Sequence, residues 1–150
     1  MVLREEGIES LREIPKPDPG LNSAMLRLEI RRGSGMKLSI IIPANNEEAT
    51  IGDVVTGVRR ELPDAEILVV DDGSTDATPQ VVADWAAQHE AAPYFVVRSL
   101  YQDNAGANAA RNRGIAAAEG AYVGFLDSDD RWRPDKLAKQ LALLRGDARM

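Results

Sequence analysis

A short acidic cluster has the residue types and spacing best suited to chemistry. The cluster, Asp127-Ser128-Asp129-Asp130, directly follows the apolar segment YVGFL at residues 122–126. That segment is apolar and rich in β-forming residues, so it is predicted to be a buried strand. Carboxylates at the end of such a strand are unfavourable unless a cation or hydrogen-bond donors compensate them. Oxygen ligands at this spacing suit Mg²⁺ or Mn²⁺ bridging to a phosphate rather than a structural zinc ion.

A helix cap is the alternative interpretation of this cluster. Pro134 is expected to open a helix that carries Leu137, Leu141 and Leu144, and one acidic side chain could cap that helix. Three carboxylates within four residues exceed what a cap requires, so ligand binding is the favoured interpretation.

Three other predicted strands also end in polar clusters. These are Asn45-Asn46-Glu47-Glu48, Asp71-Asp72-Gly73-Ser74 and Asp103-Asn104-Ala105-Gly106. Turn formation alone could account for the second cluster, because each of its residue types favours turns. Two carboxylates directly after a buried strand are nevertheless more than a turn needs. They could accept hydrogen bonds from a nucleobase or from a ribose hydroxyl.

The predicted helix after the third of these clusters has the features of an anion site. Asn104 and Gly106 precede its start, and Arg111 and Asn112 lie in its first turns. The free N–H groups and the dipole of a helix N-terminus favour an anion, and Arg111 is a natural partner for a phosphate. The alternative is an ordinary helix capped by asparagine, with Arg111 in solvent.

Strand and helix signals alternate along the chain from Leu38 onwards. The expected strands are LSIIIPA (38–44), EILVV (66–70), YFVVRSL (94–100) and YVGFL (122–126). The expected helices cover about 51–62, the segment from Asp76 or Thr78 through Trp85, about 109–118, and the segment after Pro134. Repeated β-α units imply a parallel sheet, which binds ligands at the carboxyl ends of its strands. We therefore expect the four polar clusters to converge on one rim.

Composition and charge exclude several classes of protein. The 150 residues, 44% of them hydrophobic and 28% charged, are typical of one globular domain. A net charge of −6 without a basic stripe argues against a nucleic acid polymer as partner. The absence of cysteine excludes a disulfide framework and a Cys-based zinc site. No secretory signal or membrane span is recognisable, so a cytoplasmic location is expected. Membrane contact, at the inner face in a full-length form, would come only from sequence outside this chain.

The chain divides into an N-terminal extension and a domain. Residues 1–35 contain Pro15, Pro17 and Pro19 and end in the linker-like Gly33-Ser34-Gly35. We expect this extension to be poorly ordered or loosely packed. Residues 36–150 are expected to form the α/β domain.

A likeness to a known enzyme family extends over most of this domain. The residues that carry it begin with Ser39-Ile40-Ile41-Ile42-Pro43, Asn46-Glu47-Glu48 and Val69-Val70-Asp71-Asp72-Gly73-Ser74-Thr75-Asp76. They continue with Asn104, Gly106, Ala109, Arg111, Asn112, Gly114, Gly120 and Leu126-Asp127-Ser128-Asp129-Asp130. In this order and at these intervals, residues from about 37 to 145 resemble the family 2 glycosyltransferases, including their Asp-x-Asp motif.

The resemblance implies a fold, a reaction and a cofactor. The fold would be α/β, of the Rossmann-like GT-A type, with a mostly parallel sheet flanked by helices. The reaction would transfer a sugar, with inversion, from a nucleoside-diphosphate sugar to an acceptor hydroxyl. Mg²⁺ or Mn²⁺ would bind the diphosphate, and the acceptor would be a carbohydrate, a lipid-linked molecule or a protein.

The resemblance also assigns roles to individual residues. The donor-binding positions are Pro43, Ala44, Asn46, Glu47, Asp71, Asp72, Asn104, Gly106, Arg111, Asn112, Asp127 and Ser128. Pro43 and the residues after it would line the base pocket. Asp72 would bond the base, with Asp71 beside it. Asp129 would be the direct metal ligand, and Asp127 would approach the ribose or the metal shell.

The sequence departs from the family pattern in two places. Asn45 stands where an aromatic residue is common in the family. Family members also continue well past the Asp-x-Asp strand into an acceptor-binding half, which normally supplies the Asp or Glu base of inverting transfer. The chain is therefore expected to be a donor-binding half, truncated after the fourth strand and its helix. No catalytic base is identified in it.

Three other readings remain as alternatives. A non-catalytic nucleotide-sugar-binding fragment would have the same fold without the chemistry. A receiver-type phosphoacceptor signalling domain is suggested by LVVDD (68–72) and Leu126-Asp127, but a strand then precedes the first expected one. A dehydrogenase of the Rossmann type is disfavoured because no G-x-G-x-x-G motif follows a strand.

Overall fold

One mixed sheet organises the described part of the chain. The computed structural model describes residues 2–3, 38–89, 96–133 and 135–144. The strands, in the spatial order β1-β5-β2-β3-β4, are β1 (Val2–Leu3), β5 (Tyr122–Phe125), β2 (Leu38–Ala44), β3 (Glu66–Asp72) and β4 (Val97–Gln102). The helices are α2 (Ile51–Glu61), α3 (Thr78–Gln88), α4 (Ala107–Ala117) and α5 (Lys136–Leu144). None of these helices is long and apolar enough to cross a membrane.

The predicted parallel α/β sheet is confirmed. β5, β2, β3 and β4 pair in parallel. The chain moves outward from β2 to β3 and β4, and then returns to the other side of β2 to form β5. Strand order therefore reverses between β2 and β5. In open α/β sheets, ligands bind at the carboxyl ends of the strands next to such a reversal.

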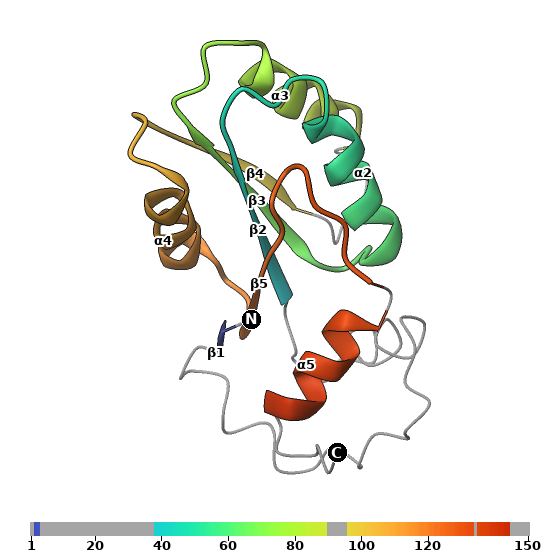
Figure 1. Cartoon of the computed structure of the whole chain (residues 1–150). Coiled ribbons are helices and arrows are strands. Elements are labelled where there is room, and N and C mark those ends of the chain that lie inside the picture. Colours follow the sequence, from blue (N-terminus) through green and yellow to red (C-terminus); the bar gives the residue numbers. More distant parts are fainter. Residues whose placement is uncertain (1, 4–37, 90–95, 134, 145–150) are drawn as a thin grey trace.

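Helices cover both faces of the sheet. α2, α3 and α5 contribute to the core on one face, and α4 packs on the opposite face (Figure 1). Ile40 and Ile42 point to the first face and Ile41 to the second, and all three are fully buried. Burial on both faces explains why β2 is a continuous apolar run rather than an alternating one.

Several element boundaries differ from the sequence prediction. β3 continues through Asp71 and Asp72, so these two residues belong to the strand and not to the turn after it. β4 begins at Val97 and extends to Gln102, because its pairing with β3 continues that far. The earlier residues 94 and 95 of that predicted strand lie outside the described residues. Strand ends depend on the neighbouring strand, which hydrophobicity along one segment does not reveal.

The N-terminus adds a strand that was not predicted. Val2 and Leu3 form β1, which pairs antiparallel with Val123 and Tyr122 of β5. The rest of the predicted N-terminal extension, residues 4–35, lies outside the described residues. Pro134, expected to open the last helix, also lies outside them, and α5 begins at Lys136.

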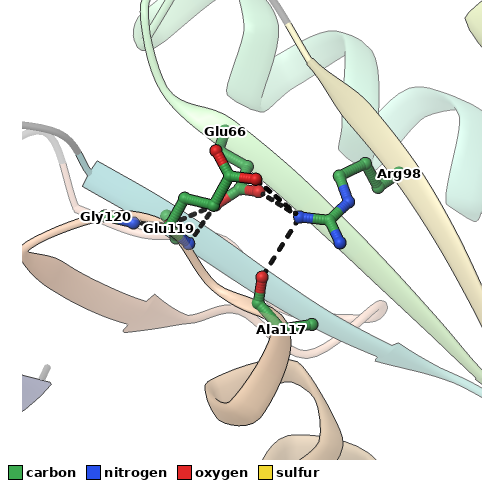
Figure 2. Close-up of polar contacts among 6 residues, drawn as sticks. Glu66, Arg98, Ala117, Glu119 and Gly120 are labelled. Carbon is green, nitrogen blue, oxygen red and sulfur yellow. Dashed lines mark hydrogen bonds and ion pairs between the residues drawn. The ribbon is translucent and has the colours of Figure 1, made fainter.

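A hydrogen-bond network at the amino ends of the strands anchors the far end of α4 (Figure 2). Glu66 accepts hydrogen bonds from the Ser39 hydroxyl at 2.5 Å, the Glu119 N–H at 2.9 Å and the Arg98 guanidinium at 3.0 Å. Arg98 also donates to the carbonyl of Ala117, the last residue of α4, at 3.1 Å. A cation is favourable at a helix C-terminus. The network therefore fixes α4 to the sheet and helps to hold its N-terminus at the opposite end.

Close packing of α4 on β2 explains a glycine inside that helix. A Cβ atom on Gly114 would lie 2.5 Å from Cγ2 of Ile41. Because Ile41 is fully buried, it has little room to move aside. Glycine is therefore needed at this position despite its low helix propensity.

Replacing Gly114 with alanine is expected to lower the free energy of unfolding by about 1–3 kcal/mol, because the added methyl group overpacks the core. Gly57 of α2 is a matched control, since a Cβ atom there would meet nothing within 4 Å. Gly57→Ala should raise the free energy of unfolding by about 0.5–1 kcal/mol through helix propensity alone. Urea unfolding followed by circular dichroism measures both. A Gly114→Ala variant as stable as Gly57→Ala would contradict the close packing.

Candidate functional site

The pairing of β2 with β5 ends before the carboxyl end of β2. The carbonyl of Ile41 accepts a hydrogen bond from the Leu126 N–H at 3.0 Å, and the pairing of β2 with β5 ends there. Alternate residues of a strand direct their backbone groups to the same side, so the nitrogen of Pro43 faces β5 beyond the last paired residue. Proline therefore costs no ladder hydrogen bond in this central strand. Pro43 and Ala44, at the carboxyl end of β2, are both buried.

Two consecutive aspartates at the end of β3 point to opposite faces of the sheet. Asp71 lies two residues after Val69, so its side chain points to the same face as Val69, which lies in the core beneath α2 and α3. Asp72 lies two residues after Val70, so its side chain points to the opposite face, where Val70 lies in the core beneath α4. Both carboxylates are buried, with 1% and 4% of the residue exposed. Because side chains alternate along a strand, the two residues must serve different loops.

Asp72 organises the loop that enters α4. Its Oδ1 accepts from the Gln102 amide at 2.7 Å and from the Ala105 N–H at 2.9 Å, and its Oδ2 accepts from the Gly106 N–H at 2.8 Å. Burial by itself raises the pKa of Asp72, but the hydrogen bonds from Ala105, Gln102 and Gly106 together hold it below its ordinary value. The residue is therefore an ionised anchor at the rim.

Only one of the two carboxylate oxygens of Asp71 has a hydrogen-bond partner among the described residues. Its Oδ1 accepts a hydrogen bond from the Ser74 N–H at 2.9 Å. Its Oδ2 is buried and has no hydrogen-bond partner among the described residues. A buried carboxylate oxygen without a donor is unfavourable. A ligand that brought a donor to this end of β3 would remove that cost.

Side chains join the loop after β2 to the loop after β3. Asn46 adopts a left-handed backbone conformation with φ of 57°. Its N–H donates to the Ser74 hydroxyl at 2.9 Å, and its Oδ1 accepts from the Thr75 N–H at 2.8 Å. Left-handed backbone is tolerated by asparagine better than by most residues. Asn46, predicted to line the base pocket, thus also fastens two neighbouring loops.

The two glutamates that follow extend this connection. The Glu47 N–H donates to the Thr78 hydroxyl at 2.7 Å. The Glu48 N–H donates to Asp76 Oδ2 at 3.1 Å, and the Glu48 carboxylate accepts from the Ala77 N–H at 2.9 Å. Thr78 and Asp76 were not among the predicted site residues. Their hydroxyl and carboxylate groups were visible only as a cap signal, and no local pattern identifies partners about 30 residues away.

The loop after β4 touches the loop after β3. A Cβ atom on Gly73, which has φ of 72°, would lie 2.7 Å from the backbone nitrogen of Asn104. Gly106 has φ of 89° and immediately precedes α4. Both positions lie in the left-handed region that favours glycine. The predicted donor-site residues Asn104 and Gly106 therefore sit directly beside the end of β3.

An ion pair connects α4 to the acidic cluster. The Arg111 guanidinium lies 2.6 Å from Asp127 Oδ1 and also donates to the Asn108 side chain at 3.1 Å. The alternative of Arg111 free in solvent is therefore wrong. Asn112 is exposed on α4, Ser128 is buried, and the 127–130 segment is a turn closed by the Asp130 N–H and the Asp127 carbonyl.

Hydrogen bonds connect the first polar cluster to the second and the second to the third. Helix α4 and its Arg111–Asp127 ion pair connect the third cluster to the fourth. The connection passes from Asn45, which donates to the Asp72 carbonyl at 2.6 Å, through Gly106 and α4 to Arg111 and Asp127. The clusters thus form one rim at the switch in strand order. Carboxylates, helix-entry N–H groups and a guanidinium together suit a ligand with both a polar ring and phosphates.

A divalent cation fits this rim as a partner of a phosphate. Within the described residues, no group of three or more His, Cys, Asp or Glu side chains gathers to form a complete metal site. Asp129 is exposed, and one carboxylate oxygen of Asp127 is paired with the Arg111 guanidinium. Mg²⁺-type ions are commonly held by one or two carboxylates, with substrate phosphates and water completing the shell. The donor set matches that mode of binding.

A protein-family model and a curated relative both match most of this chain. The family model described as Glycosyl transferase family 2 matches residues 39–149. TuaG, a glycosyltransferase assigned to teichuronic acid biosynthesis in Bacillus subtilis, is 39% identical over 108 residues, which are 71% of this chain and 41% of TuaG.

Solved structures of glycosyltransferases share the fold. The mannosyltransferase PcManGT from Pyrobaculum calidifontis, in complex with GDP-Man and Mn²⁺, aligns with a TM-score of 0.64 and 25% identity over 93% of this chain and 38% of its own. Residues 1–349 of S. aureus TarS, in complex with UDP-GlcNAc, align with a TM-score of 0.57 and 31% identity over 74% of this chain and 32% of that 1–349 chain. The chain thus spans less than half the length of each of these three proteins.

Proposed function

The chain belongs to glycosyl transferase family 2, and we propose that it supplies the donor-binding half of an inverting, metal-dependent sugar transferase. The donor would be a nucleoside-diphosphate sugar, and the acceptor group would be a hydroxyl. One observation carries this proposal: the rim from Asp72 through Gly106 and Arg111 to Asp127 lies at the switch in strand order. Solved relatives were studied with UDP-GlcNAc and with GDP-Man, which supports a nucleotide-sugar donor.

The base is proposed to bind between the ends of β2 and β3. Pro43, Ala44, Asn46 and Glu47 would line its pocket. Asp72 Oδ2 accepts one hydrogen bond from Gly106, so it retains acceptor capacity for a base N–H. Asp71 would lie beside it. The cross-loop hydrogen bonds of Asn46 would hold the pocket in shape before the nucleotide binds.

The diphosphate is proposed to lie between the start of α4 and the acidic cluster. Asn104, Gly106, Asn112 and Ser128 are the other donor-site positions carried over from the family pattern. Arg111 holds Asp127 in position, and its charge also favours a phosphate nearby. Asp127 would approach the ribose or the metal shell.

Asp129 is proposed as the direct ligand of Mg²⁺ or Mn²⁺. It is exposed at the tip of the turn, so its carboxylate is accessible. A divalent cation there would stabilise the charge that develops on the departing nucleoside diphosphate. Deprotonation of the acceptor hydroxyl needs a base, and no described residue is assigned that role.

Calorimetric titration of UDP and GDP into the 150-residue chain tests the proposal. At least one of them should bind, and Mn²⁺ should strengthen that binding. With a nucleotide-sugar and a sugar acceptor, the chain alone should show negligible transfer, because the base is proposed to lie in an acceptor-binding half. Absence of nucleotide binding would refute the donor site, whereas robust turnover would refute the assignment to a donor-binding half.

The partners follow from the same proposal. The acceptor is proposed to be a carbohydrate, a lipid-linked molecule or a protein, and no nucleic acid polymer is involved. We propose a cytoplasmic location, with membrane contact arising only through sequence outside this chain. Membership of the family argues against the receiver-type signalling domain, which would become labelled on Asp127 by acetyl phosphate.

A further inference from the structure

A cavity of about 420 Å³ lies between the segment after the acidic cluster and α5. Four basic side chains line it, namely Arg131, Arg133, Lys136 and Lys139. Two carboxylates, Asp130 and Asp135, also contribute. The lining is therefore net positive, although the whole chain carries a net charge of −6. A positive concave surface on an acidic protein concentrates anions locally.

Two of these cations lack a carboxylate partner in the described part of the chain. Asp135 pairs with both Lys139, at 2.7 Å, and Arg133, at 3.7 Å. Among the described residues, neither Arg131 nor Lys136 forms an ion pair, and the Lys136 ammonium group lies over the ring of Trp132. Its Nζ lies 4.3 Å from the ring centroid. Within the described part of the chain, Arg131 and Lys136 are therefore the lining cations left for a ligand.

The wall of the cavity is anchored to the sheet. Trp132 also lines the cavity and packs against the core. A Cβ atom on Gly124 of β5 would lie 3.0 Å from the Trp132 ring. The missing side chain of Gly124 therefore makes room for the indole, which fixes the loop at residues 130–133 close to β5. The backbone that carries Arg131 is therefore held in place before a ligand binds, which reduces the conformational freedom lost on binding.

The acidic cluster separates this cavity from the donor rim. Asp127 pairs with Arg111 of α4 on one face of the sheet, whereas Asp130 lines the cavity beside α5, which packs on the other face. A transfer reaction needs a second substrate next to the departing diphosphate. The cavity and the Arg111–Asp127 pair thus lie on opposite faces of the sheet, which favours the acceptor over the donor as its ligand.

We propose that this cavity binds a phosphate group of the acceptor, through Arg131 and Lys136. The inference rests on the proposed function, because an acceptor requires a transferase. It places one contact to the acceptor on this chain, whereas the catalytic base is proposed to lie in the acceptor-binding half. It narrows the acceptor to molecules that carry a phosphate or an equivalent anion near the hydroxyl that receives the sugar. Arg131 and Lys136 would bind and orient that group.

Titration of glycerol 3-phosphate into the full chain tests the site, with uncharged glycerol as the reference ligand. Glycerol 3-phosphate should bind and glycerol should not, and added salt should weaken the binding. The double variant Arg131→Gln/Lys136→Gln should lose affinity by about tenfold or more. Arg60→Gln/Arg113→Gln removes the same charge from exposed positions on α2 and α4 and should change affinity less than twofold. Equal effects of the two double variants would overturn the proposal.

A competition experiment shows whether the cations of the cavity bind the acceptor or the donor diphosphate. Saturation with Mn²⁺ and whichever of UDP or GDP binds should leave the affinity for glycerol 3-phosphate within about twofold. Displacement of glycerol 3-phosphate would assign the cations to the donor diphosphate and overturn the proposal. Loss of nucleotide binding with retained glycerol 3-phosphate binding would instead refute the proposed function and leave the anion site standing.

Discussion

Replacing Asp129 with alanine is expected to remove the effect of Mn²⁺ on nucleoside diphosphate binding. Asp129 is an exposed carboxylate of the acidic cluster, while Asp127 is engaged by Arg111 at 2.6 Å. When a cation takes only one or two ligands from the protein, loss of one carboxylate removes much of its attachment. Affinity measured with Mn²⁺ should fall by about 100-fold, or about 2.7 kcal/mol, to the value measured without metal.

The neighbouring residue provides a matched control for this experiment. Asp130→Ala removes the same charge one position away, and Asp130 is also exposed. That variant should keep most of the Mn²⁺ effect, since the proposed ligand is intact. Calorimetric titration of the nucleotide at several Mn²⁺ concentrations measures both variants. If Asp129→Ala retained the full Mn²⁺ dependence, the ligand assignment would be wrong.

Replacing Asp72 with asparagine is expected to weaken both the fold and nucleotide binding. The carboxylate accepts from Gln102, Ala105 and Gly106 at 2.7–2.9 Å. An asparagine amide would place its NH₂ group against one of these donors. The free energy of unfolding should fall by about 2–4 kcal/mol, since charge-assisted hydrogen bonds are lost and a buried donor is left unpaired. Nucleotide affinity should fall about tenfold even without metal, because the loop that enters α4 loses its anchor.

The pH dependence of stability checks the same residue independently. Hydrogen bonding holds the pKa of Asp72 below its ordinary value of 3.8 despite burial. A lowered folded-state pKa contributes stability that is fully present above pH 3.8 and is lost as the pH falls below it. The Asp72→Asn variant should therefore lose less stability than the parent chain between pH 4 and lower values.

Asp84→Asn serves as the control for both measurements on Asp72. Asp84 is exposed on α3, and it accepts a hydrogen bond from Gln80 that an amide oxygen could also accept. Its replacement should change the free energy of unfolding by no more than about 0.5 kcal/mol. An Asp72→Asn variant that behaved like Asp84→Asn in urea unfolding and in nucleotide titration would refute the anchoring role.

Much of the fold could be predicted from the sequence because its signals are local. The apolar run LSIIIPA coincides with β2, and the alternation of strands and helices predicted a parallel sheet. Hydrophobic periodicity encodes element type directly, since each element must bury one or both of its faces. The polar clusters at the strand ends followed from the same pattern. The assignment of their residues to base, phosphate and metal stays a prediction.

Other features were decided only by the tertiary structure, because they depend on which segments become neighbours. The consecutive Asp71 and Asp72 look equivalent in sequence, yet strand alternation sends one toward Ser74 and the other toward α4. The pairing of Arg111 with Asp127 joins residues 16 positions apart in separate elements.

The packing of Gly124 and the cavity beside α5 were also decided only by the tertiary structure. Glycine in a strand has no side chain to pack, and the nearby Trp132 ring explains why Gly124 occupies this position in β5. The sequence by itself determined that acidic and amide groups would meet at the carboxyl edge of a parallel sheet. Strand register and helix packing decided which of those groups bind each other and which remain available, since hydrogen-bond partners are selected by distance in space and not along the chain.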